Sequence, residues 1–176
     1  SALLSAEKDR LMALPTNSFK PLSVYETEAA GEAIRGLMVG ATDGVPYLEA
    51  IGYLAYTFDT ADGKHYFLLR EPRDPIGPEQ FRGLGLVVIN RASSSRVVIH
   101  AKHVGNDSKS HVTSRLFFED LGALALVWNG VRRCDSNELS SCTSQTAPNA
   151  ICGGFGDPIS DASVSPALGA NAGIAD

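Results

Sequence analysis

The feature that most constrains the fold is an uninterrupted apolar run, "ALALVW", at residues 123–128. Its apolar residues do not alternate with polar ones, so a strand made from it would be buried on both faces. Such a strand lies in the middle of a sheet that is covered on both sides. The run is far shorter than the roughly 20 apolar residues of a membrane-spanning helix. We therefore expect a central strand and a layer of helices on each face of the sheet.

The residues before this run predict a strand followed by a helix. "RVVIH", residues 96–100, is β-branched and apolar, and the period then changes to that of a helix in "SHVTSRLFFEDLG". One face of this helix would carry the apolar residues Val112, Leu116, Phe117 and Leu121. Ser108 or Ser110 would cap its start, and Gly122 would end it. Strand, helix and strand in succession predict a βαβ unit with two parallel strands.

The first half of the chain predicts hairpins and helices. We expect a short helix capped by Ser5, a helix near residues 26–38, and a β-hairpin turning at Asp62-Gly63 within residues 47–72. The serines at 93–95 are typical of a further hairpin turn between two strands. Hairpins together with a βαβ unit indicate an α/β fold, a three-layer sandwich with a mixed β-sheet.

The last part of the chain differs from the body at residues 1–133. Residues 134–176 are rich in Ser, Ala and Gly, show no period, and predict a long irregular segment packed on one domain. Cys134, Cys142 and Cys152 all lie there among polar residues, which favours a disulfide. Each possible pair closes a short loop, so all three stay open, and Cys142 with Cys152 is our working assignment. A disulfide implies a secreted, periplasmic or cell-surface protein.

The charge distribution excludes two classes of partner. Residues 1–133 hold all 15 Lys and Arg residues and 15 of the 20 Asp and Glu residues, whereas the remainder is purely acidic. Nucleic acid and anionic membrane surfaces both require a basic face. We expect neither nucleic-acid binding nor membrane insertion.

Three of the four histidines cluster between residues 97 and 111, together with Asp107. In the βαβ unit, His103 and Asp107 follow the first parallel strand, and Arg132 and Arg133 follow the second. The carboxyl ends of adjacent parallel strands lie at one edge, where ligands of open α/β sheets bind. Imidazole and carboxylate are suitable zinc ligands, and arginine can hold a carboxylate with two hydrogen bonds. His100 and His103 would point to opposite sides of an extended strand, so exposed loop histidines are the alternative.

Residues 84–163 resemble the zinc-dependent N-formylglutamate amidohydrolases and the poly-γ-glutamate hydrolases. The motifs of these families are His-Pro-x-x-Asp after a strand, a helix starting at Thr, Gly-x-x-Arg after the next strand, and Ser-Asp-x-x-His. The matching residues are His103 with Asp107, Ser110 at the helix start, Gly130 with Arg133, and Ser160 with Asp161. Val104 replaces the proline, and Val164 stands in place of the last histidine.

The resemblance implies a zinc site and a substrate site. His103 and Asp107 would bind zinc, with His100 or His111 in place of the missing histidine. Arg133 and Ser160 would bind a small acidic or peptide-like substrate, and Asp161 would act as a base or support the site.

Two functions follow from this pattern. The first is a zinc-dependent amidohydrolase, and the second is a catalytically inactive relative that acts as a secreted or surface structural protein and self-associates. The second is favoured by the apolar, base-free end "ASVSPALGANAGIAD".

Overall fold

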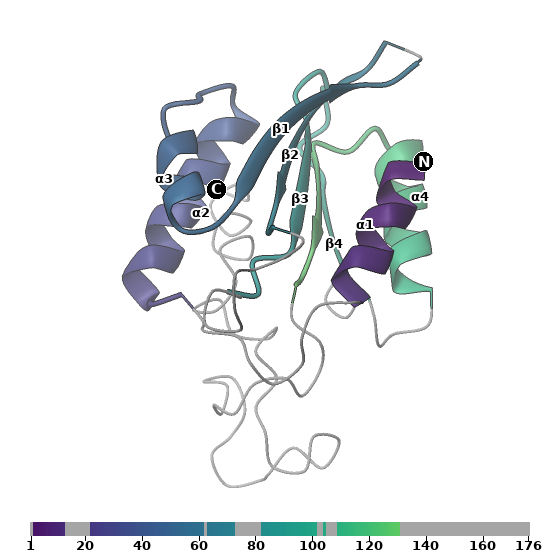
Figure 1. Cartoon of the computed structure of the whole chain (residues 1–176). Coiled ribbons are helices and arrows are strands. Elements are labelled where there is room, and N and C mark those ends of the chain that lie inside the picture. The colour runs from purple at the N-terminus through teal and green to yellow at the C-terminus, as the bar shows by residue number, and fades with distance from the viewer. Residues whose placement is uncertain are drawn as a thin grey trace, which may run out of the picture.

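The structure is a computed structural model, and it describes residues 2–12, 22–61, 63–72, 82–101, 104 and 109–130. Within these residues a five-stranded sheet is covered by helices on both faces (Figure 1). The predicted α/β fold with a mixed sheet is thereby confirmed. The predicted irregular segment and its three cysteines lie outside the described residues.

The sheet has the strand order β1-β2-β3-β5-β4. The strands are β1 (Leu54–Asp59), β2 (His65–Arg70), β3 (Leu86–Asn90), β4 (Val98–Ala101) and β5 (Ala125–Trp128). All neighbouring pairs are antiparallel except β4 and β5, which are parallel. All four residues of β5 are buried, as the apolar run predicts for a strand covered on both faces.

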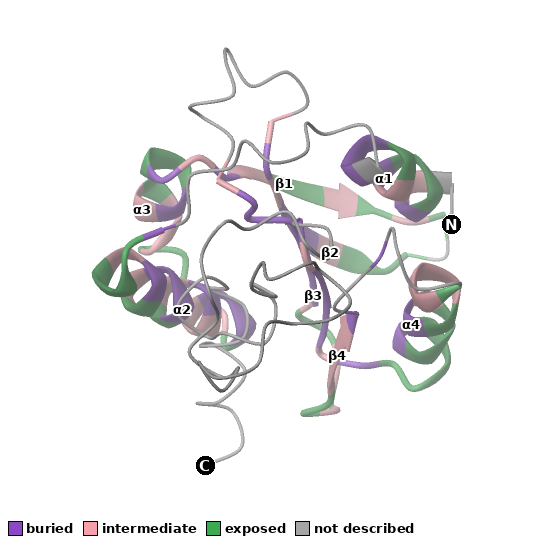
Figure 2. Cartoon of the chain, turned by 90° about the horizontal axis from the view of Figure 1, so that it is seen from below, coloured by how far each residue is buried: buried purple, intermediate pink, exposed green. Residues whose placement is uncertain are grey.

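Two helices cover each face of the sheet. The helices α2 (Val24–Met38) and α3 (Val45–Ala50) lie on one face, and α1 (Ala2–Met12) and α4 (Ser110–Asp120) lie on the other. Figure 2 shows the four helices turning their buried sides toward the sheet. Two hydrophobic clusters result, one centred on Ile34, Leu48 and Val87, and the other on Leu86, Phe118 and Trp128. Each cluster buries apolar area that stabilises the three-layer arrangement.

The predicted helix at residues 26–38 is confirmed as α2, and a capping box fixes its start. Ser23 accepts a hydrogen bond from the Glu26 backbone N–H, and the Ser23 backbone N–H donates to Glu26 Oε2 at 2.8 Å. This backbone donor and the Ser23 hydroxyl, with a smaller contribution from Arg82, lower the pKa of Glu26 to about 2. The start of α1 differs from prediction, because the helix begins at Ala2 and Ser5 is an exposed residue within it.

Two predictions about the strands are wrong: where the first hairpin begins, and whether a second hairpin forms. Residues 47–50 belong to α3, whose first turn contains Pro46, a residue with the backbone φ of a helix start. The predicted hairpin at residues 93–95 does not form, since β5 lies between β3 and β4. All four residues of β5 are buried, whereas only Ala101 of β4 is, so β5 occupies the inner position and leaves β4 at the edge.

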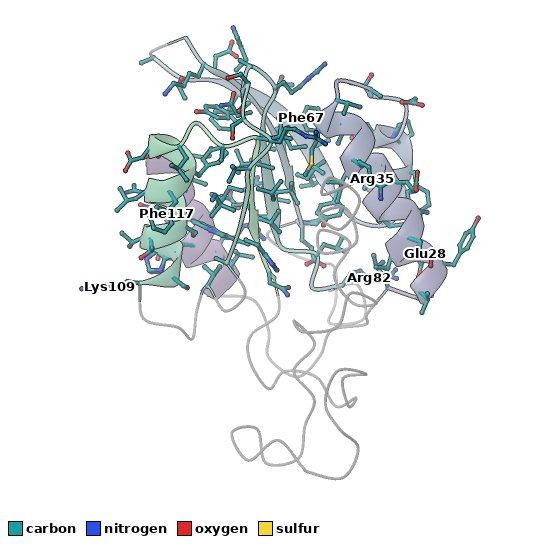
Figure 3. All side chains as sticks on the ribbon, turned by 180° about the vertical axis from the view of Figure 1, so that it is seen from behind. Glu28, Arg35, Phe67, Arg82, Lys109 and Phe117 are labelled. Carbon is teal, nitrogen blue, oxygen red and sulfur yellow. The ribbon has the colours of Figure 1, made fainter. Side chains whose placement is uncertain are left out.

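The predicted buried face of α4 is also wrong. The buried residues are Ser114 and Phe118, whereas Leu116, Phe117 and Leu121 are 43%, 53% and 57% exposed. Figure 3 shows Phe117 on the outer side of this helix. Ser114 is buried because its hydroxyl accepts the Nε1–H of Trp128 at 2.9 Å. The need of a buried indole for an acceptor therefore outweighs the apolar pattern. Ser110 is the first residue of the helix and not its cap: the N-cap is Lys109, with φ 64° and no side-chain capping bond, and Ser108 lies outside the described residues.

Candidate functional site

The strands β2, β4 and β5 run in one direction, so their carboxyl ends lie at one edge of the sheet. We call this the carboxyl edge; it is the lower end of the sheet in Figure 1. Ala101 is the register partner of Trp128, and these two residues end β4 and β5. The chain therefore leaves two adjacent strands side by side, which confirms the predicted βαβ unit. His103 follows the end of β4 by two residues, and Arg133 follows the end of β5 by five.

Most of the predicted site residues lie outside the described residues. These are His103, Asp107, Arg133, Ser160, Asp161, Cys142 and Cys152. Their roles stay predictions, and the structure places only the strands and the helix that flank them.

Of the residues predicted to bind metal or substrate, the structure describes His100 and His111, and His100 is half-buried in β4. Its neighbours Ile99 and Ala101 pack in the cluster beneath α1 and α4, whereas Val98 packs in the cluster beneath α2 and α3. Because side chains alternate along a strand, His100 faces the same side as Val98. Among the described residues, no group of three or more His, Cys, Asp and Glu side chains could hold a metal ion.

His111, the other possible replacement ligand, lies in the first turn of α4 among charged groups. It lines a cavity together with Lys8, Asp9 and Arg115. Burial, Lys8 and Arg115 lower the pKa of His111, and Asp9 opposes them. A neutral imidazole suits a metal, but two neighbouring cations repel a divalent ion. His111 is therefore a poor candidate for a third metal ligand.

Two glycine-containing segments meet at the centre of the carboxyl edge. A side chain at Gly85, where φ is +72°, would meet the Gly130 nitrogen at 2.6 Å. A side chain at Gly130 would meet the Gly85 Cα at 2.8 Å and the Gly83 carbonyl carbon at 2.9 Å. This close approach gives a physical reason for the glycine of the Gly-x-x-Arg match. It fixes the point at which the chain leaves β5 on the way to Arg133.

The buried Glu71 follows β2 at the same edge and accepts backbone hydrogen bonds. One of its oxygens accepts from the Arg82 N–H, and the other accepts from the Leu84 N–H at 3.0 Å. Burial raises the pKa of Glu71 to about 7, although these backbone donors and Arg10 act in the opposite direction. Glu71 thereby ties the end of β2 to the segment that enters β3.

Hydrogen bonds and ion pairs of Arg10 and Glu7 join this edge to α1. Arg10 Nη1 donates to the Glu71 backbone oxygen at 3.0 Å, and Arg10 Nε donates to Glu7 at 2.6 Å. Glu7 also accepts from Arg70 Nη1 at 2.7 Å. Glu7 and Arg10 are buried, so these two charges remain stable only because they are paired. The local sequence signal for this group is the i,i+3 spacing of Glu7 and Arg10, whereas its link to β2 through Arg70 has no local signal.

In comparisons with known proteins, no family model, curated protein or solved structure matches this chain. In the described part of the chain, no helix combines the length and the apolar character needed to cross a bilayer. The carboxyl edge therefore stands as a candidate site on its own geometry: adjacent parallel strands, a fixed backbone crossing and a buried charge network.

Proposed function

We propose that the chain is an exported, metallohydrolase-like α/β protein that binds a small acidic or peptide-like substrate at its carboxyl edge. The single observation that supports this most is the parallel pairing of β4 and β5, with Ala101 opposite Trp128. This pairing starts the segments with His103 and Arg133 from neighbouring positions, at the edge where open α/β sheets bind ligands.

The proposed roles follow from the chemistry of each side chain. Arg133 would hold a substrate carboxylate through two parallel hydrogen bonds, and Ser160 would donate a third. Asp161 would accept a proton from the attacking water or orient a neighbouring group. A bound zinc would make hydroxide available near neutral pH.

The metal part of the proposal requires one more ligand. A catalytic zinc takes three protein ligands, and His103 with Asp107 would give two. His100, which faces the α2 side of the sheet, stays the proposed third ligand. His111 lies beside Lys8 and Arg115, whose positive charges make it a poorer choice.

Metal analysis tests the hydrolase proposal directly. Protein purified without chelator should contain about one zinc per chain, and His103→Ala should lose it because one of few ligands is removed. His65→Ala is the matched control, since His65 is exposed and paired with Asp59 at 2.5 Å in the distant hairpin. Equal zinc content in the His103 and His65 variants would rule out the proposed ligand.

A self-associating, inactive relative is the second candidate, and the outer face of α4 favours it. Phe117 and Leu121 lie one turn apart and are more than half exposed. Large exposed apolar residues that adjoin one another are typical of interfaces. In sedimentation velocity, concentration-dependent association that Phe117→Ser abolishes would support this candidate. Tyr25→Ser, at an exposed position of α2, is the control that should leave association unchanged.

A further inference from the structure

A cavity of about 190 Å³ lies between α1 and α4, on the face of the sheet opposite α2. Figure 3 shows the two helices side by side, with Lys109 marking the start of α4. The cavity is lined from α1 by Lys8 and Asp9, from α4 by His111 and Arg115, and from β5 by Trp128. None of these residues belongs to the proposed zinc or substrate site.

The polar side of this cavity carries one positive charge in excess. Lys8 Nζ pairs with Asp9 Oδ1 at 2.6 Å, so these two charges offset each other. Arg115 forms no ion pair with a described residue, and its buried Nε has no hydrogen-bond acceptor among them. The buried Nδ1 of His111 likewise lacks a partner within the described part of the chain. A guanidinium with free donors beside a cavity is suited to a carboxylate, which it binds with two parallel hydrogen bonds.

The cavity is also lined by the apolar residues Leu4, Val112 and Trp128. The hydrogen bond from Trp128 Nε1 to Ser114 fixes the indole, and Trp128 and Leu4 are almost fully buried. A ligand that is charged at one end and apolar at the other would satisfy both kinds of lining residue.

We propose that this cavity binds a small monocarboxylate with a short aliphatic body. The carboxylate bonds to Arg115, and the aliphatic body packs against Leu4, Val112 and Trp128. The cavity volume equals that of about six water molecules at roughly 30 Å³ each, which suits a ligand of the size of butyrate. A phosphate dianion fits less well, because its second charge would face Asp9 with only one excess cation to balance it.

Butyrate titration of the full chain tests this proposal. Trp128 is the only tryptophan and lies on the cavity wall, so its fluorescence reports occupancy. At constant ionic strength in sodium chloride, butyrate should give a saturable change with a Kd of about 1–10 mM, as expected for so small a ligand. Arg115→Gln should weaken binding at least tenfold. Arg96→Gln, an exposed residue before β4 at the opposite edge, is the matched control and should stay within twofold of wild type.

A second variant covers the case in which Arg115→Gln fails to fold. Val112→Glu places a negative charge at the cavity in the first turn of α4, a position where helices favour acids, so folding should survive while binding is lost. A linear response matched by chloride, unchanged binding in the folded variants, or phosphate binding as tight as butyrate would each overturn the proposal. Zinc content should not change in either variant, which separates this site from the proposed hydrolase site.

Discussion

The contact between Gly130 and the Gly83–Gly85 segment makes the sharpest prediction about stability. In Gly130→Ala, the new Cβ would lie 2.8 Å from the Gly85 Cα and 2.9 Å from the Gly83 carbonyl carbon. Real Cβ atoms essentially never approach other atoms closer than 3.0 Å. The opposing atoms belong to the backbone, so no side-chain rotation can relieve the contact. The end of β5 would have to move away from the entry to β3.

The magnitude follows from the cost of overpacking. Inserting a methyl group into a close-packed site typically costs about 1–3 kcal/mol, and more where the neighbours cannot move. We expect about 3 kcal/mol for Gly130→Ala. Gly63→Ala is the matched control, because Gly63 has φ +77° but nothing within 4 Å of its would-be Cβ. Its cost is only that of holding a residue with a Cβ at positive φ, about 1 kcal/mol of unfolding free energy.

Urea denaturation monitored through the single Trp128 measures both variants, since this residue ends the strand that precedes Gly130. With an m-value of about 2 kcal/mol/M, the midpoint should fall by about 1.5 M in Gly130→Ala and by about 0.5 M in Gly63→Ala. A Gly130→Ala midpoint at or above that of Gly63→Ala would show that the two backbones do not meet as described.

Three further predictions concern buried or capped polar groups. The pKa of Glu71 is raised to about 7 from 4.5, so its contribution to stability is complete below pH 4.5 and is lost as pH rises through 7. Chemical denaturation from pH 4 to 8 should therefore show a loss of about 3 kcal/mol in wild type that Glu71→Gln lacks; parallel curves would contradict this. Ser23→Ala should cost about 1 kcal/mol at pH 7 in thermal unfolding. The difference should shrink as pH falls from 4.5 toward 2, because the substitution removes the Ser23 hydroxyl, one of the groups that lower the pKa of Glu26, while the larger contribution of the Ser23 backbone N–H remains. Ser114→Ala should cost about 1–3 kcal/mol by leaving the Trp128 indole N–H without its acceptor, and a combined Ser114→Ala, Trp128→Phe variant should show less than the sum of the single losses.

The fold could be predicted from the sequence where a strand has to be buried on both faces, because such a strand has only one possible place, the inside of a covered sheet. The apolar run at residues 123–128 requires cover on both sides, and the preceding strand and helix then require a parallel neighbour. The serine segment at 93–95 was misinterpreted because a local turn signal does not reveal whether a third strand enters between two others. The order of β3, β5 and β4 follows from burial: β5 has a continuous apolar sequence, so it takes the inner position between the other two strands.

The buried face of α4 could not be predicted from its apolar residues alone. Periodicity favoured Leu116, Phe117 and Leu121, but Ser114 turns inward because Trp128 needs an acceptor. The sequence does not reveal the buried Glu71 for a related reason, since its carboxyl accepts from backbone N–H groups that lie 11 and 13 residues away in sequence. For the candidate site, topology predicted that β4 and β5 end side by side, which the structure confirms. The positions of His103 and Arg133 stay predictions, because they depend on segments without a periodic pattern.

The carboxyl edge combines features that a packed core alone would not need. Gly85 against Gly130 brings two backbones together, and Glu71 holds the entry to β3 through buried hydrogen bonds. Buried charges of this kind cost stability relative to apolar residues of the same volume, so their presence indicates a demand for fixed geometry. These contacts form a rim at the ends of β2 and β5, where the chain leaves the sheet. If zinc analysis finds no metal, that rim still requires an explanation, and a ligand held by Arg133 without a metal becomes the hypothesis to test next.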